Sequence, residues 1–379
     1  MSFSLYLHYP FCASKCSYCD FYKEIYHGAA ELEFFEALKT ETRLAAENLG
    51  DSGRDISTIF IGGGTPSLIN TESLADWLDL LRRHFALSND LEFSIESNPE
   101  SVTLENLRAF GKLGVNRPVF GIQSFNTKVL KILGREHNPH HSQRAIYYAN
   151  ALGFKNFGVD IIFGLPFQTS RMLVDDIDQI IDLDPPHISF YQLTVEEGTP
   201  LATMVRGGKV RLPDNELSLA MYKGSCQRFI EAGYTRYEVS SFAKPDFECR
   251  HNLSYWHGSD YLGLGPSAHS FINGQRFMNR ANVSEYIGLL QKNELPRSVD
   301  KSGREERMTE AIMLGLRTAG GISREMFSQR FGVPLEACLD RRQYEMLVRS
   351  GHLIPEKGSL RLSDDGIVLA DEITRRLIK

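Results

Sequence analysis

The segment "LYLHYPFCASKCSYCDF" (residues 5–21) carries three of the six cysteines of this 379-residue chain. They are Cys12, Cys16 and Cys19, in the spacing Cys-x3-Cys-x2-Cys. The apolar and aromatic run before them, residues 3–9, is typical of a β-strand. A loop at the end of a strand is a poor place to bury three side chains, so packed core thiols explain this cluster badly. The segment predicts a strand followed by a loop that carries ligands.

The same alternation of strand and helix continues through the first half of the chain. Further β-like runs occupy residues 57–63, 91–97, 117–123, 157–164 and 187–194. Segments with helical apolar spacing lie between them, at 31–49, 71–85, 103–113, 126–133, 142–152 and 171–182, with Thr71 and Thr103 as expected N-caps. Such alternation predicts an α/β fold with a parallel sheet and right-handed crossovers. Because no Gly-x-Gly-x-x-Gly loop is present, we expect a full or partial βα barrel, with its chemistry at the carboxyl ends of the strands.

Three regions are expected along the chain. Residues 1–200 form the barrel core, and residues 201–296 complete the barrel with a loop-rich segment. Residues 297–379 read as a smaller, mainly helical module with a hairpin at 353–363, in the order of a winged helix. That module holds 15 Lys and Arg against 13 Asp and Glu, a net of +2, so a structural or partner-docking role is favoured over DNA binding.

The composition excludes several classes of protein. The formal net charge of −6 leaves no overall basic surface, so no nucleic-acid partner is expected. No apolar run approaches the roughly 18 residues of a membrane span, and the N-terminus lacks the features of a signal peptide. We therefore expect a cytoplasmic protein. Disulfides are rare in that compartment, so clustered cysteines indicate metal or cluster ligands.

Two kinds of inorganic site can explain the three cysteines. A structural zinc ion takes four ligands, commonly from two Cys-x-x-Cys pairs, and here only Asp20 or His8 stands near enough in sequence to complete the set. A [4Fe–4S] cluster is the better interpretation, because thiolates suit iron–sulfur and three ligands leave one iron open for chemistry.

Polar and glycine-rich motifs follow the later strands. They are "GGGTP" (62–66), "ESNPE" (96–100), "GIQSF" (121–125) and "GVDIIFGLP" (158–166). Glycines let a backbone approach a ligand closely. Glu96, Gln123 and Asp160 stand near the ends of consecutive strands and can converge on one polar ligand, while Arg135 offers a fork for a carboxylate. Taken singly, each of these residues is more readily a cap or a surface group, but together behind the cysteine loop they favour a cofactor site.

These motifs, in this order, resemble the radical S-adenosylmethionine (SAM) superfamily and, within it, the HemN/HemW branch. The resemblance implies a radical SAM-type barrel in which Cys12, Cys16 and Cys19 ligate the [4Fe–4S] cluster and SAM chelates the open iron. It also implies a SAM site formed by Tyr6, Tyr18, Gly63, Gly64, Thr65, Glu96, Gln123, Arg135 and Asp160. Whether SAM is cleaved, and so whether the chain is an enzyme, stays open.

Two members of this branch differ near the cluster motif. The oxygen-independent coproporphyrinogen III oxidase carries a further cysteine two positions after the third, where this chain has Phe21. It also has an N-terminal extension, whereas the expected first strand here starts at the beginning of the chain. Both departures favour the heme-chaperone side of the branch, with the oxidase of porphyrin biosynthesis as the alternative.

The motif "HNLSYW" (251–256) matches the His-Asn-x-x-Tyr-Trp signature of that side. It implies heme binding, with His251 as an axial ligand and Tyr255 and Trp256 as flat faces for the macrocycle. A satisfied core histidine is the ordinary alternative, and His257 and His269 are rival ligands. The implied partners are apo-hemoproteins, including respiratory ones reached at the membrane through partners. A homodimer is an alternative to a monomer, because the sequence pattern does not indicate an interface.

Overall fold

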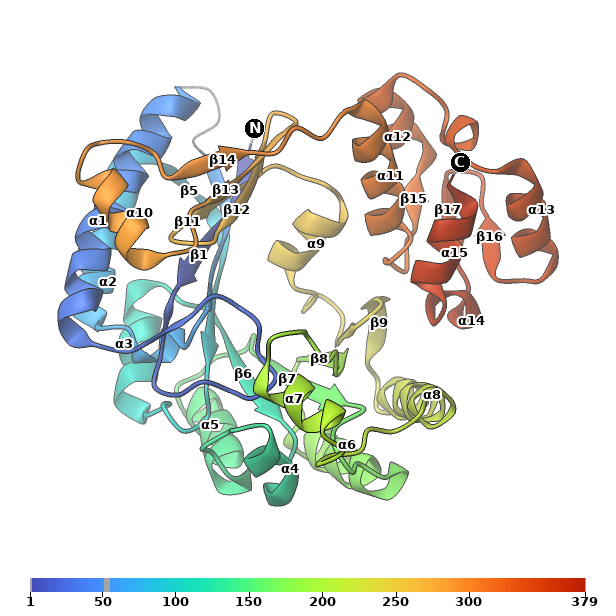
Figure 1. Ribbon diagram of the computed structural model, residues 1–379, viewed down its shortest axis with the longest axis horizontal. Coiled ribbons are helices and arrows are strands. Elements are labelled where there is room, and N and C mark those ends of the chain that lie inside the picture. Colours follow the sequence, from blue (N-terminus) through green and yellow to red (C-terminus); the bar gives the residue numbers. More distant parts are fainter. Residues whose placement is uncertain (1, 51–54, 379) are drawn as a thin grey trace.

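A computed structural model describes residues 2–50 and 55–378, and a 12-stranded sheet forms its centre (Figure 1). The inner strands all run parallel. In spatial order they are β11 (Tyr261–Leu264), β1 (Ser2–Tyr9), β4 (Asp55–Gly63), β5 (Ala86–Ser97), β6 (Arg117–Gln123), β7 (Gly158–Phe163) and β8 (His187–Gln192). All the strands expected in the first half are thus confirmed, and the α/β class with them.

Antiparallel strands extend both edges of this sheet. β10 (Ser241–Ala243) and β9 (Thr235–Glu238) continue from β8, while β12 (His269–Ile272), β13 (Gln275–Asn279) and β14 (Arg297–Val299) continue from β11. Among the described residues no pairing joins β14 to β9, so the sheet is a partial barrel. A short helix, α9 (Arg250–Trp256), lies between the two edges (Figure 1).

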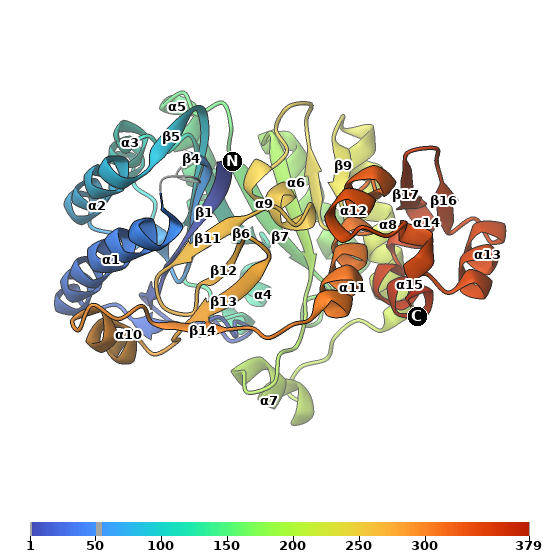
Figure 2. The same cartoon turned by 90° about the horizontal axis from the view of Figure 1, so that it is seen from above.

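Helices cover the outer face of the curved sheet (Figure 2). They are α1 (Gly28–Leu49), α2 (Thr71–His84), α3 (Leu104–Leu113), α5 (Pro139–Ala151), α6 (Ser170–Leu183) and α8 (Asn215–Glu231). The short helix α4 (Thr127–Ile132) instead packs with Ile162 of β7 at the carboxyl end of the strands. The period of two along a strand decides what each face presents. In β1, Leu5, Leu7 and Tyr9 join the apolar core under α1 and α2, so Tyr6 and His8 point into the barrel.

Two helix caps were predicted from the sequence, and the structure bears out one of them. Thr103 caps α3 as predicted, in a capping box with Asn106. Thr71 does not cap α2. Asn70 does, because its side-chain oxygen accepts from the backbone N–H groups of Glu72 and Ser73, which makes Thr71 the first helical residue.

The C-terminal region packs around its own apolar cluster. Its elements are α11 (Arg304–Gly315), β15 (Ile322–Ser323), α12 (Arg324–Phe331), α13 (Arg341–Arg349), β16 (Leu353–Pro355), β17 (Ser359–Leu362), α14 (Asp364–Ile367) and α15 (Ala370–Leu377). The predicted hairpin is β16–β17, and β15 adds a third strand, as in a winged helix. Backbone hydrogen bonds from Val239 to Arg317 and from Ala319 to Tyr237, each 2.9 Å, join this region to β9. In the described part of the chain, no helix has the length and apolarity needed to cross a bilayer.

Candidate functional site

A cavity of about 440 Å³ opens at the carboxyl ends of the parallel strands. The loops after β1, β4, β5, β6 and β8 all contribute to it, together with Asp160 and Ile162 of β7, as that end of a parallel sheet predicts. Of the residues implied by the resemblance, those that line the cavity are Cys12, Cys16, Tyr18, Cys19, Gly63, Gly64, Thr65, Glu96, Gln123, Arg135 and Asp160. Tyr6 is not among the lining residues. It lies deeper in the barrel, where its hydroxyl is 3.1 Å from Nδ1 of His8.

The cysteine loop is held in place by backbone contacts on both sides. β2 (Phe11–Cys12) pairs with β3 (Glu24–Ile25), so the loop is closed at its base. Ser17 fixes its tip: its Oγ donates to the carbonyl of Ile132 at 2.8 Å, and its carbonyl accepts from Leu201 N–H at 2.9 Å. These two hydrogen bonds attach the loop to α4 and to α7 (Pro200–Arg206) without the help of a ligand.

The three thiols lie along the border of the cavity and do not converge on a single point. Within residues 2–50 and 55–378, no three His, Cys, Asp or Glu side chains are placed to hold a single metal ion. Burial raises the pKa of the Cys12 thiol, against a hydrogen bond from Thr65 that lowers it. Nη1 of Arg135 lies 3.6 Å from Sγ of Cys16. Three soft donors around one cavity beside a cation fit a cluster with an open iron.

The glycine loop packs against the cysteine segment. Gly64 N–H donates to the Tyr9 carbonyl at 2.7 Å, and Thr65 N–H donates to the Phe11 carbonyl at 2.8 Å. A Cβ on Gly64 would lie 2.5 Å from the Phe11 carbonyl oxygen. On Gly63, whose φ is 106°, it would lie 2.7 Å from the His8 ring. The glycines are therefore needed for close contact with β1 and the cysteine loop, in addition to the contact with a ligand that the sequence suggested.

Two half-buried carboxyl groups, Glu96 and Asp160, face the cavity. Burial and, to a smaller extent, the nearby Asp160 raise the pKa of Glu96 to about 8, against a hydrogen bond from Gly63 N–H at 3.2 Å that lowers it. Burial also raises the pKa of Asp160 to about 6, and a hydrogen bond from Ser189 and the charges of Arg117 and Arg135 limit that rise. Carboxyl groups with raised pKa values in a cavity are typical of a functional site, and a cationic ligand would favour their ionised forms.

Arg135 joins three of the loops instead of standing free for a carboxylate. Its Nη2 donates to Oδ1 of Asn98 and to the carbonyl of Gly121, both at 2.8 Å, in addition to the Cys16 contact. Asn98 was not singled out in the sequence, although it lies two residues after Glu96 in the motif at the end of β5. Gln123 ends β6 with a φ of 66°, and this left-handed turn accompanies the placement of its amide at the cavity.

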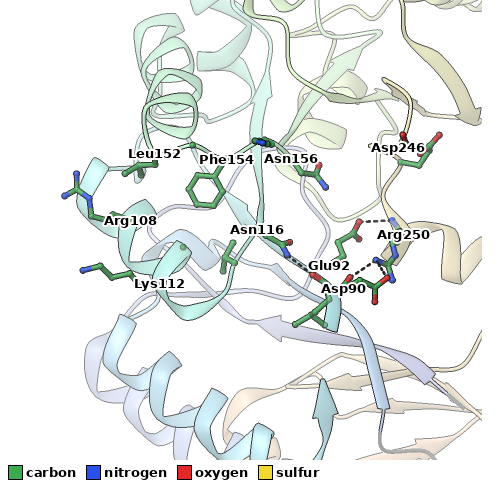
Figure 3. A pocket seen from close by; sticks show the side chains of 16 residues that line it. Asp90, Glu92, Arg108, Lys112, Asn116, Leu152, Phe154, Asn156, Asp246 and Arg250 are labelled. Carbon is green, nitrogen blue, oxygen red and sulfur yellow. Dashed lines mark hydrogen bonds and ion pairs between the residues drawn. The ribbon is translucent and has the colours of Figure 1, made fainter. Parts of the chain in front are cut away.

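The "HNLSYW" helix is anchored at its N-terminus from the opposite end of the strands. Figure 3 shows Glu92 of β5 beside Arg250, at a separate pocket of about 690 Å³. The Glu92 carboxylate accepts from the backbone N–H of His251 at 2.9 Å and from that of Arg250 at 3.1 Å. Arg250 in turn pairs with Asp90 at 3.2 Å. Cys249 is the N-cap residue of α9, but its side chain makes no capping hydrogen bond. The Glu92 carboxylate therefore caps the helix in its place.

His251 lies in the barrel interior with both ring nitrogens hydrogen bonded. Nδ1 is 2.8 Å from Oγ1 of Thr58, and Nε2 is 2.8 Å from the hydroxyl of Tyr255. Burial lowers the pKa of His251 to about 3. In this arrangement His251 can ligate iron only by losing one of these bonds. The guanidinium carbon of Arg317 lies 5.9 Å from the centre of the Trp256 ring.

Comparisons with known proteins agree with this geometry. Residues 6–180 match the radical SAM superfamily, and residues 303–369 match the HemN C-terminal domain. The heme chaperone HemW of Bacillus subtilis is 34% identical over 98% of this chain and 97% of its own length. That of Mycobacterium tuberculosis H37Rv is 36% identical over 99% and 95%. The solved structure of coproporphyrinogen III oxidase (HemN) from Escherichia coli aligns with a TM-score of 0.85 and 23% identity, over 99% of this chain and 89% of that one, which shows a shared fold.

Proposed function

Because this chain belongs to the HemW family of heme chaperones within the radical SAM superfamily, we propose that it binds heme and delivers it to apo-hemoproteins. The observation that carries the proposal is similarity to these chaperones over nearly the whole chain. One side chain supports it over the oxidase alternative. Phe21, at the position of the oxidase's further cysteine, lines the cavity with 63% of its surface exposed, and a phenyl ring cannot supply the thiol that the oxidase carries there.

In this proposal Cys12, Cys16 and Cys19 hold a [4Fe–4S] cluster. Their fit rests on soft donors that border one cavity, on the anchored loop and on Arg135 beside Cys16. A bound cluster would supply the electron that cleaves SAM in this superfamily. Tyr18, which lies between the cysteines and lines the same cavity, would cover the cluster from the loop side.

SAM would occupy the remaining space of the cavity. Its sulfonium charge suits Glu96 and Asp160, which are half-buried and face the same cavity. Gln123 and the backbone of Gly63, Gly64 and Thr65 would orient it. Tyr6 would act only indirectly, through His8, whose ring packs against Gly63.

The partners follow from the proposed activity. The acceptors would be apo-hemoproteins, respiratory ones included, and contact with a membrane would be made through them. The winged-helix region would serve docking, since its charge is nearly balanced. A homodimer would be one way to complete a docking surface.

A test of heme delivery starts from protein reconstituted anaerobically with iron, sulfide and SAM. The heme-loaded protein is mixed with an apo-hemoprotein from the same cell, and transfer is followed by the shift of the Soret band. Apomyoglobin, mixed in parallel, measures passive release. In a second vessel the protein receives coproporphyrinogen III and a reductant. Transfer that is faster than passive release, with no protoporphyrinogen formed, supports the proposal, whereas turnover of coproporphyrinogen without heme binding overturns it.

A further inference from the structure

A second hollow, of about 480 Å³, lies between the β12–β13 hairpin, α9 and α11. Its aromatic wall is continuous: the Tyr255 and Tyr261 rings meet edge to face at 4.6 Å, and Tyr261 and Phe271 lie 6.4 Å apart. A groove of this size is within the range that binds cofactors. Flat aromatic faces suit a flat apolar ligand.

Three arginines also line this groove, and they leave positive charge uncompensated. Arg276 is paired with Glu310 at 2.5 Å. Arg307 donates to the carbonyl of Gly274 at 3.2 Å. Arg330 lies 5.3 Å from the centre of the Phe271 ring and makes no ion pair within the described residues. The lining carboxylates are Glu310, already paired, and Asp300, which is bonded to Ser302. The groove therefore suits a ligand with carboxylate groups.

His269 supplies an imidazole without a partner at the same place. It begins β12, is exposed, lines the groove, and its ring makes no hydrogen bond within the described residues. In His251, by contrast, both ring nitrogens are hydrogen bonded.

We propose that this groove is the heme seat, with His269 as the axial ligand of the iron and Arg307 and Arg330 paired with the propionates. The assignment rests on the proposed function, because only a heme carrier needs such a seat. The motif then contributes Tyr255 to the aromatic wall. His251 is a positioning residue, which holds the Tyr255 hydroxyl and anchors α9 to β4 through Thr58.

The test is a heme titration of the full chain, followed by the Soret band. We expect His269→Ala to lose the axial-ligand spectrum and added imidazole to restore it. The double variant Arg307→Ala/Arg330→Ala should bind heme about 10- to 100-fold more weakly, since it removes charge-assisted bonds. Two exposed residues outside the groove serve as matched controls, His27→Ala and Arg280→Ala, and both should match wild type.

The outcomes separate this inference from the proposed function. If wild type binds no heme, the proposed function falls. If wild type binds heme and His269→Ala keeps the same spectrum and affinity, the groove assignment alone falls. It also falls if His251→Ala loses the axial-ligand spectrum while His269→Ala keeps it. Far-UV circular dichroism of each variant shows that the loss is not unfolding.

Discussion

Arg135 and Cys16 are 119 residues apart in sequence, and the guanidinium Nη1 of one lies 3.6 Å from the Sγ of the other. The same guanidinium binds Asn98 after β5 and the Gly121 carbonyl in β6. One buried cation therefore joins the cysteine loop to two strand ends. The position of the thiols depends on that junction as well as on the loop's own sequence.

Arg135→Ala should destabilise the protein by roughly 2–4 kcal/mol, because it leaves the Asn98 and Gly121 oxygens without their buried charged donor. Urea unfolding of the cluster-free protein measures this. Arg171→Ala is the matched control, since Arg171 is exposed and pairs only with Asp175 of its own helix. That control should change the stability by less than about 0.5 kcal/mol. An equal effect of both variants would refute the structural role of Arg135.

Replacing Cys12, Cys16 and Cys19 together with Ala should abolish the absorbance of a reconstituted cluster near roughly 400 nm. Iron and acid-labile sulfide should be lost with it. Cys226→Ala is the control, because Cys226 is buried in the core under α6 and α8 and is far from the cavity. A triple variant that still assembles the cluster would show that other ligands hold it.

SAM binding should tighten as the pH rises from about 6.5 to 8.5. Glu96, with a pKa of about 8, must release its proton to pair with a cationic ligand, so each pH unit below that value weakens binding by at most about tenfold. Calorimetry at several pH values gives the slope. Glu96→Gln should flatten it, and Glu105→Gln, an exposed acid on α3, should leave it unchanged. If SAM binding to Glu96→Gln keeps the pH dependence of wild type, a group other than Glu96 causes that dependence.

The buried His251 should make the protein sensitive to acid. Its pKa is about 3 in the folded protein and 6.5 for an ordinary, solvated histidine, so only the unfolded chain takes up its proton between those limits. Its contribution to stability is therefore complete above pH 6.5 and is lost as the pH falls toward 3, by up to roughly 1.4 kcal/mol per unit.

A comparison with His251→Gln isolates this contribution from the other acids and bases. Wild type should be more stable than the variant at about pH 7.5, and the difference in unfolding free energy should shrink as the pH falls below about 6. His27→Gln, at an exposed position before α1, is the matched control for the loss of a histidine. A difference between wild type and His251→Gln that stays constant with pH would contradict the buried, neutral histidine.

Local patterns in the sequence determined the strands, the helices and the cysteine loop. The reason is that hydrophobic periodicity and turn residues act over a few neighbours. Because the carboxyl ends of parallel strands meet at one edge, strand order alone also brought Glu96, Gln123 and Asp160 to one cavity. The error at Asn70 was equally local: two adjacent polar residues competed for one cap.

Tertiary structure decided the features that depend on contacts between segments far apart in the sequence. The depth of Tyr6 below the cavity, the hydrogen bonds that occupy His251 and the anchoring of α9 by Glu92 all involve partners that no spacing rule connects. The open imidazole of His269 became visible only when β12, α9 and α11 came to border one groove. A sequence names the groups able to bind, but packing decides which of them already have a partner, because each hydrogen-bonding atom is satisfied by whatever the fold places beside it.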